Sequence, residues 1–119
     1  MSVDYAAQRM ELEQGLAQLG QEIPGPMGGF ARLHRKAIAD GALSSSVKEM
    51  MALAISIVVG CEGCIAYHVH DAVEAGASRD ELLETIGVAV LMGGGPASIH
   101  ATGALEAVNQ FSRLPVEMR

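Results

Sequence analysis

Aromatic residues are nearly absent from this sequence of 119 residues, which contains two Tyr, two Phe and no Trp. A core built mainly from aromatic rings is therefore excluded. Half of the residues are nonetheless hydrophobic, and seven of them are Met. A core of Ala, Leu, Ile, Val and Met suits closely packed helices. The hydrophobic share is high for a small monomer, which favours interfaces between copies of the chain.

An excess of positive charge is also lacking, because the formal net charge is −6. Nucleic-acid binding requires a basic face, so we expect no nucleic-acid partner. The chain has no polybasic run and no stretch of the roughly 18 consecutive apolar residues expected of a membrane span. Residues 1–14 carry three acidic side chains and no apolar signal region. We therefore expect a cytoplasmic protein without a membrane partner.

Cysteine occurs only twice, as Cys61 and Cys64, and His68 follows four residues after the second. On a helix these three side chains share one face, at positions i, i+3 and i+7. A Cys-x-x-Cys pair in a cytoplasmic protein serves redox or metal chemistry more often than it serves as a structural crosslink. A helix N-terminus at Cys61 would stabilise a thiolate there, and a protonated His68 would do so at Cys64.

Three other interpretations of the pair can be considered, of which the sequence excludes one. Two buried, inert cysteines would need no function. Cys61, Cys64 and His68 could supply three ligands to zinc, whereas a structural zinc site has four. Glu49 could be the fourth, although carboxylates are uncommon in structural zinc sites. A c-type haem is excluded because position 65 is Ile. We expect no metal and no cofactor.

The hydrophobic periodicity predicts one all-α domain over residues 1–119 with about six helices. The expected helices cover residues 2–19, 27–39, 47–59, 61–75, 79–92 and 96–111. Gly20 and Pro24-Gly25-Pro26 should separate the first two, and Gly93-Gly94-Gly95 should form a tight turn between the last two. Gly60 should break the chain before the cysteines.

Two Ser-x-x-Glu patterns predict capping boxes, Ser46 with Glu49 and Ser78 with Glu81. Glu49 has a second interpretation, because it begins an apolar helix where burial favours a carboxyl that takes a thiol proton.

The remaining histidines carry no motif. His70 lies on the opposite side of its helix from Cys61, which predicts a surface position. His34 and His100 are expected to be structural or interface residues.

Glu49, Cys61, Cys64 and His68 together resemble the site pattern of the alkylhydroperoxidase D (AhpD)-like branch of the carboxymuconolactone decarboxylase superfamily. The pattern is a Glu, a Cys-x-x-Cys twelve residues on, and a His four residues after the second Cys. The resemblance covers about residues 30–111, the expected core of the domain. It implies that Glu49 lies beside the cysteines, which spacing alone does not establish.

The resemblance also implies an all-helical fold that assembles into homotrimers or homohexamers. It implies a peroxidase and thiol–disulfide oxidoreductase, with Glu49, Cys61, Cys64 and His68 as catalytic residues and Glu49 and His68 relaying protons. The substrate would be a small peroxide or disulfide, and a dithiol, either a protein or a small thiol, would restore the enzyme. We favour Cys64 as the attacking thiol and Cys61 as the resolving one.

One position departs from the family pattern. The best-known alkylhydroperoxidases have a His just before the second cysteine, where this chain has Gly63. A weak peroxidase or a general thiol–disulfide oxidoreductase fits equally well. The alternatives from other classes are a decarboxylase or lactone-converting enzyme of the same superfamily, whose members generally lack the cysteine pair, and a non-catalytic oligomeric binding protein.

Overall fold

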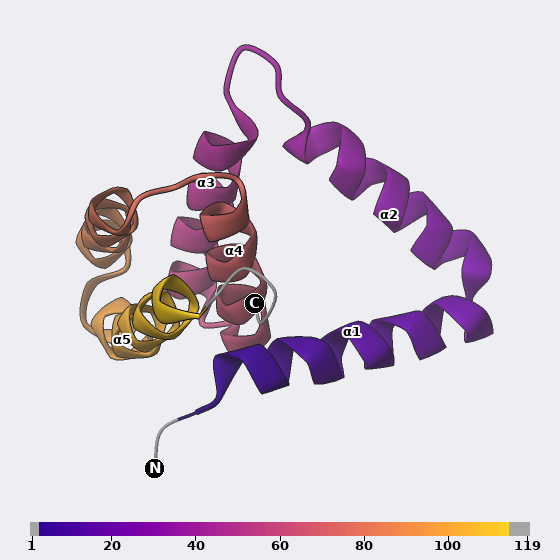
Figure 1. Cartoon of the computed structure of the whole chain (residues 1–119), viewed down its shortest axis with the longest axis horizontal. Coiled ribbons are helices and arrows are strands. Elements are labelled where there is room, and N and C mark those ends of the chain that lie inside the picture. The colour runs from indigo at the N-terminus through magenta and orange to yellow at the C-terminus, as the bar shows by residue number, and fades with distance from the viewer. Residues whose placement is uncertain (1–2, 115–119) are drawn as a thin grey trace.

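The computed structural model describes residues 3–114, and over that range its only regular elements are helices, joined by short turns. The expected all-α class is confirmed. Five helices follow one another along the chain (Figure 1): α1 Tyr5–Glu22, α2 Pro24–Ile38, α3 Ser45–Val59, α4 Glu62–Glu74 and α5 Arg79–Arg113.

Helices α3, α4 and α5 form the body of the molecule, since each packs against the other two. Its core is mainly aliphatic and rich in Ala, as the shortage of aromatic residues predicts, with Phe111 and Tyr5 as its aromatic members. The largest fully buried apolar side chains are Phe111, Leu53, Ile57, Ile65, Leu82, Val69 and Val108. Small Ala residues on α4 and α5 allow the helix backbones to approach closely.

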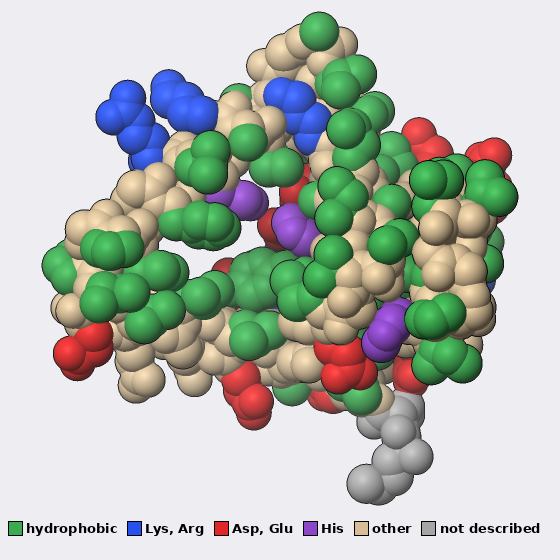
Figure 2. Space-filling model, turned by 180° about the vertical axis from the view of Figure 1, so that it is seen from behind, with side chains coloured by type: hydrophobic (Ala, Val, Ile, Leu, Met, Phe, Trp, Pro, Cys, Tyr) green, Lys and Arg blue, Asp and Glu red, His purple; other side chains and the backbone are tan. Residues whose placement is uncertain are grey.

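Helices α1 and α2 form an arm that leaves the body and returns to it (Figure 1). The start of α1 is fixed by Tyr5, which is buried and whose N–H donates to Gln110 Oε1 over 2.8 Å. Helix α2 contains no buried residue. Figure 2 shows an opening between this arm and the body, with histidine side chains at its edge.

The last two expected helices are joined in α5, which is kinked at Gly94. Gly94 has φ 68° and ψ −149°, a backbone conformation that residues other than glycine rarely adopt. The break predicted at the triple glycine is therefore present, although the helix resumes at once. Helix α5 is also long and apolar enough to cross a membrane by length and composition alone. One such helix is weak support for a span.

Two expected helix boundaries differ from the structure. Gly20 does not end the first helix, because α1 continues to Glu22. Pro24-Gly25-Pro26 does follow the break between the two helices, but it forms the first turn of α2 instead of a loop before it, since the first turn of a helix does not need the N–H that proline lacks. The Ser46–Glu49 capping box does not form, because Ser44 is the N-cap of α3 and its hydroxyl accepts from the Val47 N–H over 3.1 Å. The Ser78–Glu81 capping box is confirmed at the start of α5.

Gly60 ends α3 with φ 81°, and a Cβ on it would lie 2.7 Å from His100 Nε2. Gly60→Ala should therefore lower the free energy of unfolding by about 1–3 kcal/mol, through backbone strain and the contact with His100. Denaturant unfolding of the reduced protein measures this. Gly87→Ala is the matched control, because Gly87 lies in α5 with no atom within 4 Å of its Cβ position. It should stabilise by about 0.5–1 kcal/mol. Equal effects of both changes would contradict this account of Gly60.

Candidate redox site

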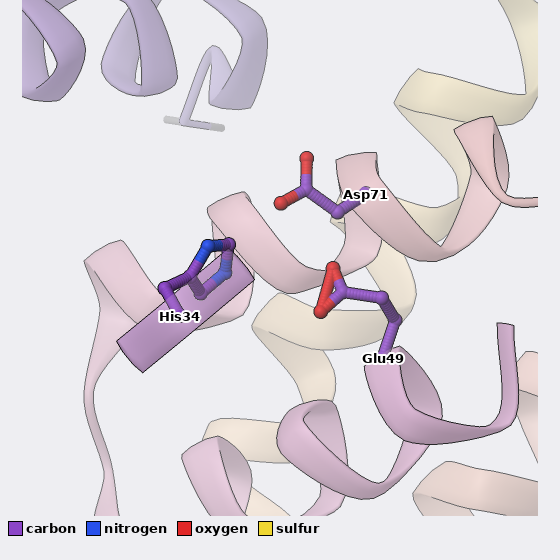
Figure 3. Close-up of side chains that lie close together, drawn as sticks. All are labelled: His34, Glu49 and Asp71. Carbon is purple, nitrogen blue, oxygen red and sulfur yellow. The ribbon is translucent and has the colours of Figure 1, made fainter. Parts of the chain in front are cut away.

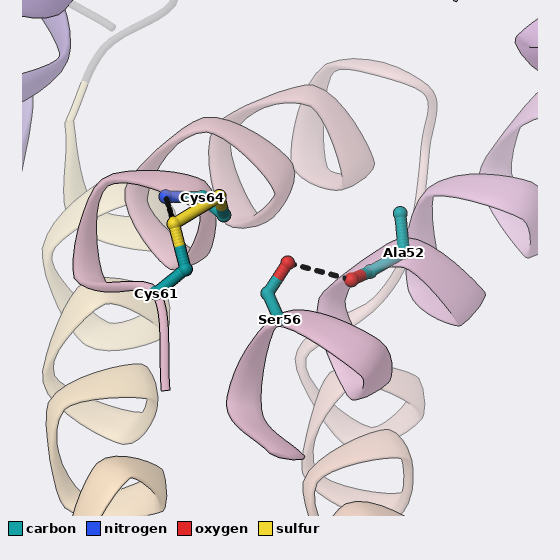
Figure 4. Close-up of a disulfide and its surroundings, with 4 residues drawn as sticks. All are labelled: Ala52, Ser56, Cys61 and Cys64. Carbon is teal, nitrogen blue, oxygen red and sulfur yellow. Dashed lines mark hydrogen bonds between the residues drawn. A yellow bond between two sulfur atoms is a disulfide. The ribbon is translucent and has the colours of Figure 1, made fainter. Parts of the chain in front are cut away.

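The two cysteines form a disulfide at the start of α4 (Figure 4), with their Cα atoms 5.2 Å apart. Cys61 is the N-cap of α4, and its Sγ accepts from the Cys64 N–H over 3.2 Å. Both residues are partly buried. The expected helix start at Cys61 is confirmed, so the partial positive charge of the N-terminus of α4 acts on its sulfur.

The end of α3 fixes the turn that leads into the disulfide. The Ser56 carbonyl oxygen accepts from the N–H groups of both Gly60 and Cys61, over 2.9 and 3.1 Å. The buried Ser56 hydroxyl donates to the Ala52 carbonyl over 2.7 Å (Figure 4), so its side chain is satisfied within α3. Cys61 is therefore attached directly to the most apolar helix of the body.

Glu49 is buried in the first half of α3, with 1% of its surface exposed. Its Oε1 lies 3.3 Å from Nδ1 of His68 on α4, and His68 is partly exposed. Since Glu49 does not cap α3, its carboxyl is available to the facing helix. The structure thus brings Glu49 to His68, one helical turn after Cys64.

The same face of α4 continues to Asp71, a residue that the sequence reasoning missed. His70 Nδ1 lies 2.8 Å from Asp71 Oδ1. Burial raises the pKa of Asp71, but hydrogen bonding and charge from His70, together with Glu49 and Arg9, outweigh it and lower that pKa. The spacing carried a signal, because residues 64, 68 and 71 share one face of a helix.

The other histidines lie at different depths. His70 is buried rather than at the surface, and its ring meets the Phe111 ring edge-on with centroids 5.5 Å apart. The surface prediction for His70 is therefore wrong, because α5 covers that side of α4. His34, on α2, is exposed, but its ring lies beside Glu49 and Asp71 (Figure 3). Nothing in the sequence around His34 indicated this position.

Known proteins match both the sequence and this arrangement of helices. The sequence profile of the carboxymuconolactone decarboxylase family matches residues 24–107. The chain belongs to this family. A family protein from Legionella pneumophila has the same fold with a TM-score of 0.88 and 41% identity, over 92% of this chain and 97% of that one. A Thermotoga maritima family member, described as a candidate participant in an antioxidative response, matches with a TM-score of 0.76 and 29% identity, over 88% of this chain and 92% of that one.

Sequence relatives lead to the AhpD branch of the family. An uncharacterized protein of Cupriavidus necator is 33% identical over 88% of this chain and 93% of its own length. The alkyl hydroperoxide reductase AhpD of Nocardia farcinica is 31% identical over 65% of this chain. The match covers only 43% of that enzyme's length, so this family member corresponds to less than half of an AhpD chain.

The contact between Glu49 and His68 can be measured as a coupling energy. In a double-mutant cycle, Glu49→Gln and His68→Ala should couple by about 1 kcal/mol, because each removes a partner of the other. Denaturant unfolding gives the four free energies. A second cycle pairs His68→Ala with Glu84→Gln, an exposed residue of α5, and should be additive within about 0.5 kcal/mol. Additivity in the first cycle as well would show that the two side chains do not interact.

Proposed function

We propose that this protein is a thiol–disulfide oxidoreductase that reduces peroxides, including alkyl hydroperoxides, through Cys61 and Cys64. The observation that carries the proposal is the Cys61–Cys64 disulfide at the N-terminus of α4, one turn before a histidine paired with a buried glutamate. A disulfide in this position is the oxidised product of the proposed reaction. Membership of a family that includes AhpD enzymes supports the same chemistry.

The reaction balances with two thiols and one peroxide. The Cys64 thiolate attacks the terminal peroxide oxygen, the O–O bond breaks, and an alcohol leaves as Cys64 becomes a sulfenic acid. The Cys61 thiolate then attacks the Cys64 sulfur, the S–O bond breaks, and water leaves. The peroxide has gained two electrons, and the two cysteine sulfurs have lost them in forming the disulfide. A dithiol, from a protein or a small molecule, returns them and releases both cysteines.

His68 and Glu49 provide for the protons in these steps. His68 is one turn from Cys64, so its ring takes the thiol proton and later returns it to a leaving oxygen. Glu49 holds the ring at Nδ1, 3.3 Å away, and its burial excludes competing water. Cys64 is the attacking thiol because it is next to His68. Cys61 is the resolving thiol because the helix N-terminus and the Cys64 N–H both stabilise its thiolate.

Gly63 replaces the histidine found in the best-known alkylhydroperoxidases, and α1 accounts for the space at this position. A Cβ on Gly63 would lie 2.9 Å from Leu12 Cδ1. The arm therefore packs where a larger side chain would stand. Because Gly63 cannot carry a proton as a histidine can, we expect peroxide turnover to be slow while thiol–disulfide exchange stays efficient.

We further propose that the protein is a homotrimer or homohexamer. Exposed apolar side chains on the arm and on α5 support this, since such surface is costly in water. The residues concerned are Met10, Phe30, Leu33, Leu91, Met92 and Ile99.

Glu49→Gln should slow disulfide formation about 10- to 100-fold while the fold remains intact, because an amide cannot hold a protonated imidazole as a carboxylate does. Stopped-flow measurement of the reduced protein with cumene hydroperoxide gives the rate, and circular dichroism checks the fold. Glu84→Gln is the control and should react like the wild type. An unchanged rate in Glu49→Gln would remove Glu49 from the mechanism.

The order of the cysteines is tested by trapping the sulfenic acid with dimedone after peroxide addition. Cys61→Ser should trap one dimedone at Cys64, because no resolving thiol remains. Cys64→Ser should react with peroxide at least about tenfold more slowly, since Cys61 lacks the neighbouring imidazole. Trapping in Cys64→Ser but not in Cys61→Ser would reverse the order. Unchanged activity with both cysteines replaced would favour a decarboxylase or lactone-converting enzyme instead.

A further inference from the structure

Three helices bring metal-ligating side chains together at the opening between the arm and the body. His34 comes from α2, Glu49 from α3 and Asp71 from α4 (Figure 3). One ligand atom of each lies within 4.8 Å of those of the other two. The imidazole and both carboxylates face a common space in Figure 3. These three groups are separate from the cysteine sulfurs considered above as zinc ligands.

We propose that His34, Glu49 and Asp71 bind a divalent transition-metal cation of the Zn²⁺ type. One imidazole nitrogen and two carboxylate oxygens form a donor set that zinc accepts with three protein ligands and an open position. Mg²⁺ and Ca²⁺ prefer oxygen ligands alone, so the imidazole disfavours them. Two carboxylates also balance the charge of the cation at a place where Glu49 is fully buried.

The groups behind the carboxylates support this assignment independently. His68 Nδ1 contacts Oε1 of Glu49 at 3.3 Å, and His70 Nδ1 contacts Oδ1 of Asp71 at 2.8 Å. A carboxylate has two oxygens, so a group oriented by a histidine can still offer oxygen to a cation. The two carboxyls also share a hydrogen bond with each other, which a cation between them would replace. Carboxylate ligands in metal sites are commonly held by hydrogen bonds of this kind. Arg9, which acts on the charge of Asp71, is itself paired with Glu13 at 2.9 Å.

Metal binding requires the three groups to come closer together. Zinc bonds to nitrogen and oxygen are about 2.0–2.2 Å long, so ligand atoms must approach more closely than 4.8 Å. Helix α2 can supply this movement, because it has no buried residue to displace and it borders the opening. The cation would thus hold the arm against the body through His34.

A cation at this place would also affect the proposed redox reaction. Glu49 would then share its negative charge between the metal and the imidazolium of His68, so it would stabilise that imidazolium less and proton transfer from Cys64 would slow. Zinc should therefore inhibit peroxide turnover without touching either cysteine. This consequence rests on the proposed function, whereas binding itself does not.

Calorimetric titration of ZnCl₂ into the tag-free Cys61→Ser/Cys64→Ser protein tests binding without competition from thiols. We expect saturable binding of one zinc per chain, weakened at least about tenfold by His34→Ala and by Asp71→Asn. His34 is exposed, so His34→Ala should fold normally. His100→Ala is the matched control and should bind zinc like its parent. Absence of saturable binding, or equal affinities in the His34→Ala and His100→Ala proteins, would overturn the proposal.

Inhibition is measured separately, on the wild type and on His34→Ala with intact cysteines. Each protein's turnover of cumene hydroperoxide is compared with its own rate in a chelator. The zinc concentration for half-inhibition should rise at least about tenfold in His34→Ala. An equal concentration for both would overturn the link between the cation and the redox site. If the wild type shows no peroxide turnover even in the chelator while zinc still binds in the calorimeter, the proposed function is contradicted and the metal site is not.

Discussion

The buried carboxyl of Glu49 is the constraint on which the site depends. A carboxyl with 1% exposure needs polar partners, because an unsatisfied buried polar group costs about 1–3 kcal/mol. Its partners are His68 and Asp71, both on the facing helix, and these contacts tie the first half of α3 to α4. The turn at Cys61 joins the end of α3 to the start of α4, so the packing of these two helices also sets where the two sulfurs lie.

The proposed chemistry and the proposed cation site both use this buried group. On one side, Glu49 reaches the imidazole beside the cysteines; on the other, it lies beside Asp71 and His34 at the opening. Helix α4 therefore carries a continuous row of reactive groups on one face, from the disulfide to Asp71. The arm covers part of this row, because Leu12 of α1 packs against Gly63 and His34 of α2 lies near the two carboxylates.

The sequence predicted what a single helix determines and missed what packing determines. Spacing placed Cys64 and His68 on one face because α4 is regular there, and Cys61 lies just before them as the N-cap. A position for Glu49 beside the cysteines was expected only through the family resemblance, since Gly60 separates its helix from theirs, and the contact of Glu49 with His68 is seen only in the structure. His70 was misplaced because its burial depends on Phe111 of α5, and His34 was missed because its neighbours are set by the path of the arm.

The central claim is that Cys61 and Cys64 exchange electrons with a peroxide. The most direct test is the intact mass of the reduced protein after alkylation, with and without one equivalent of peroxide. The account predicts that peroxide removes both alkylation sites and leaves a monomer roughly 2 Da lighter than the reduced chain. If both thiols remain open to alkylation after peroxide treatment, the disulfide is not a product of peroxide reduction and the redox account is wrong.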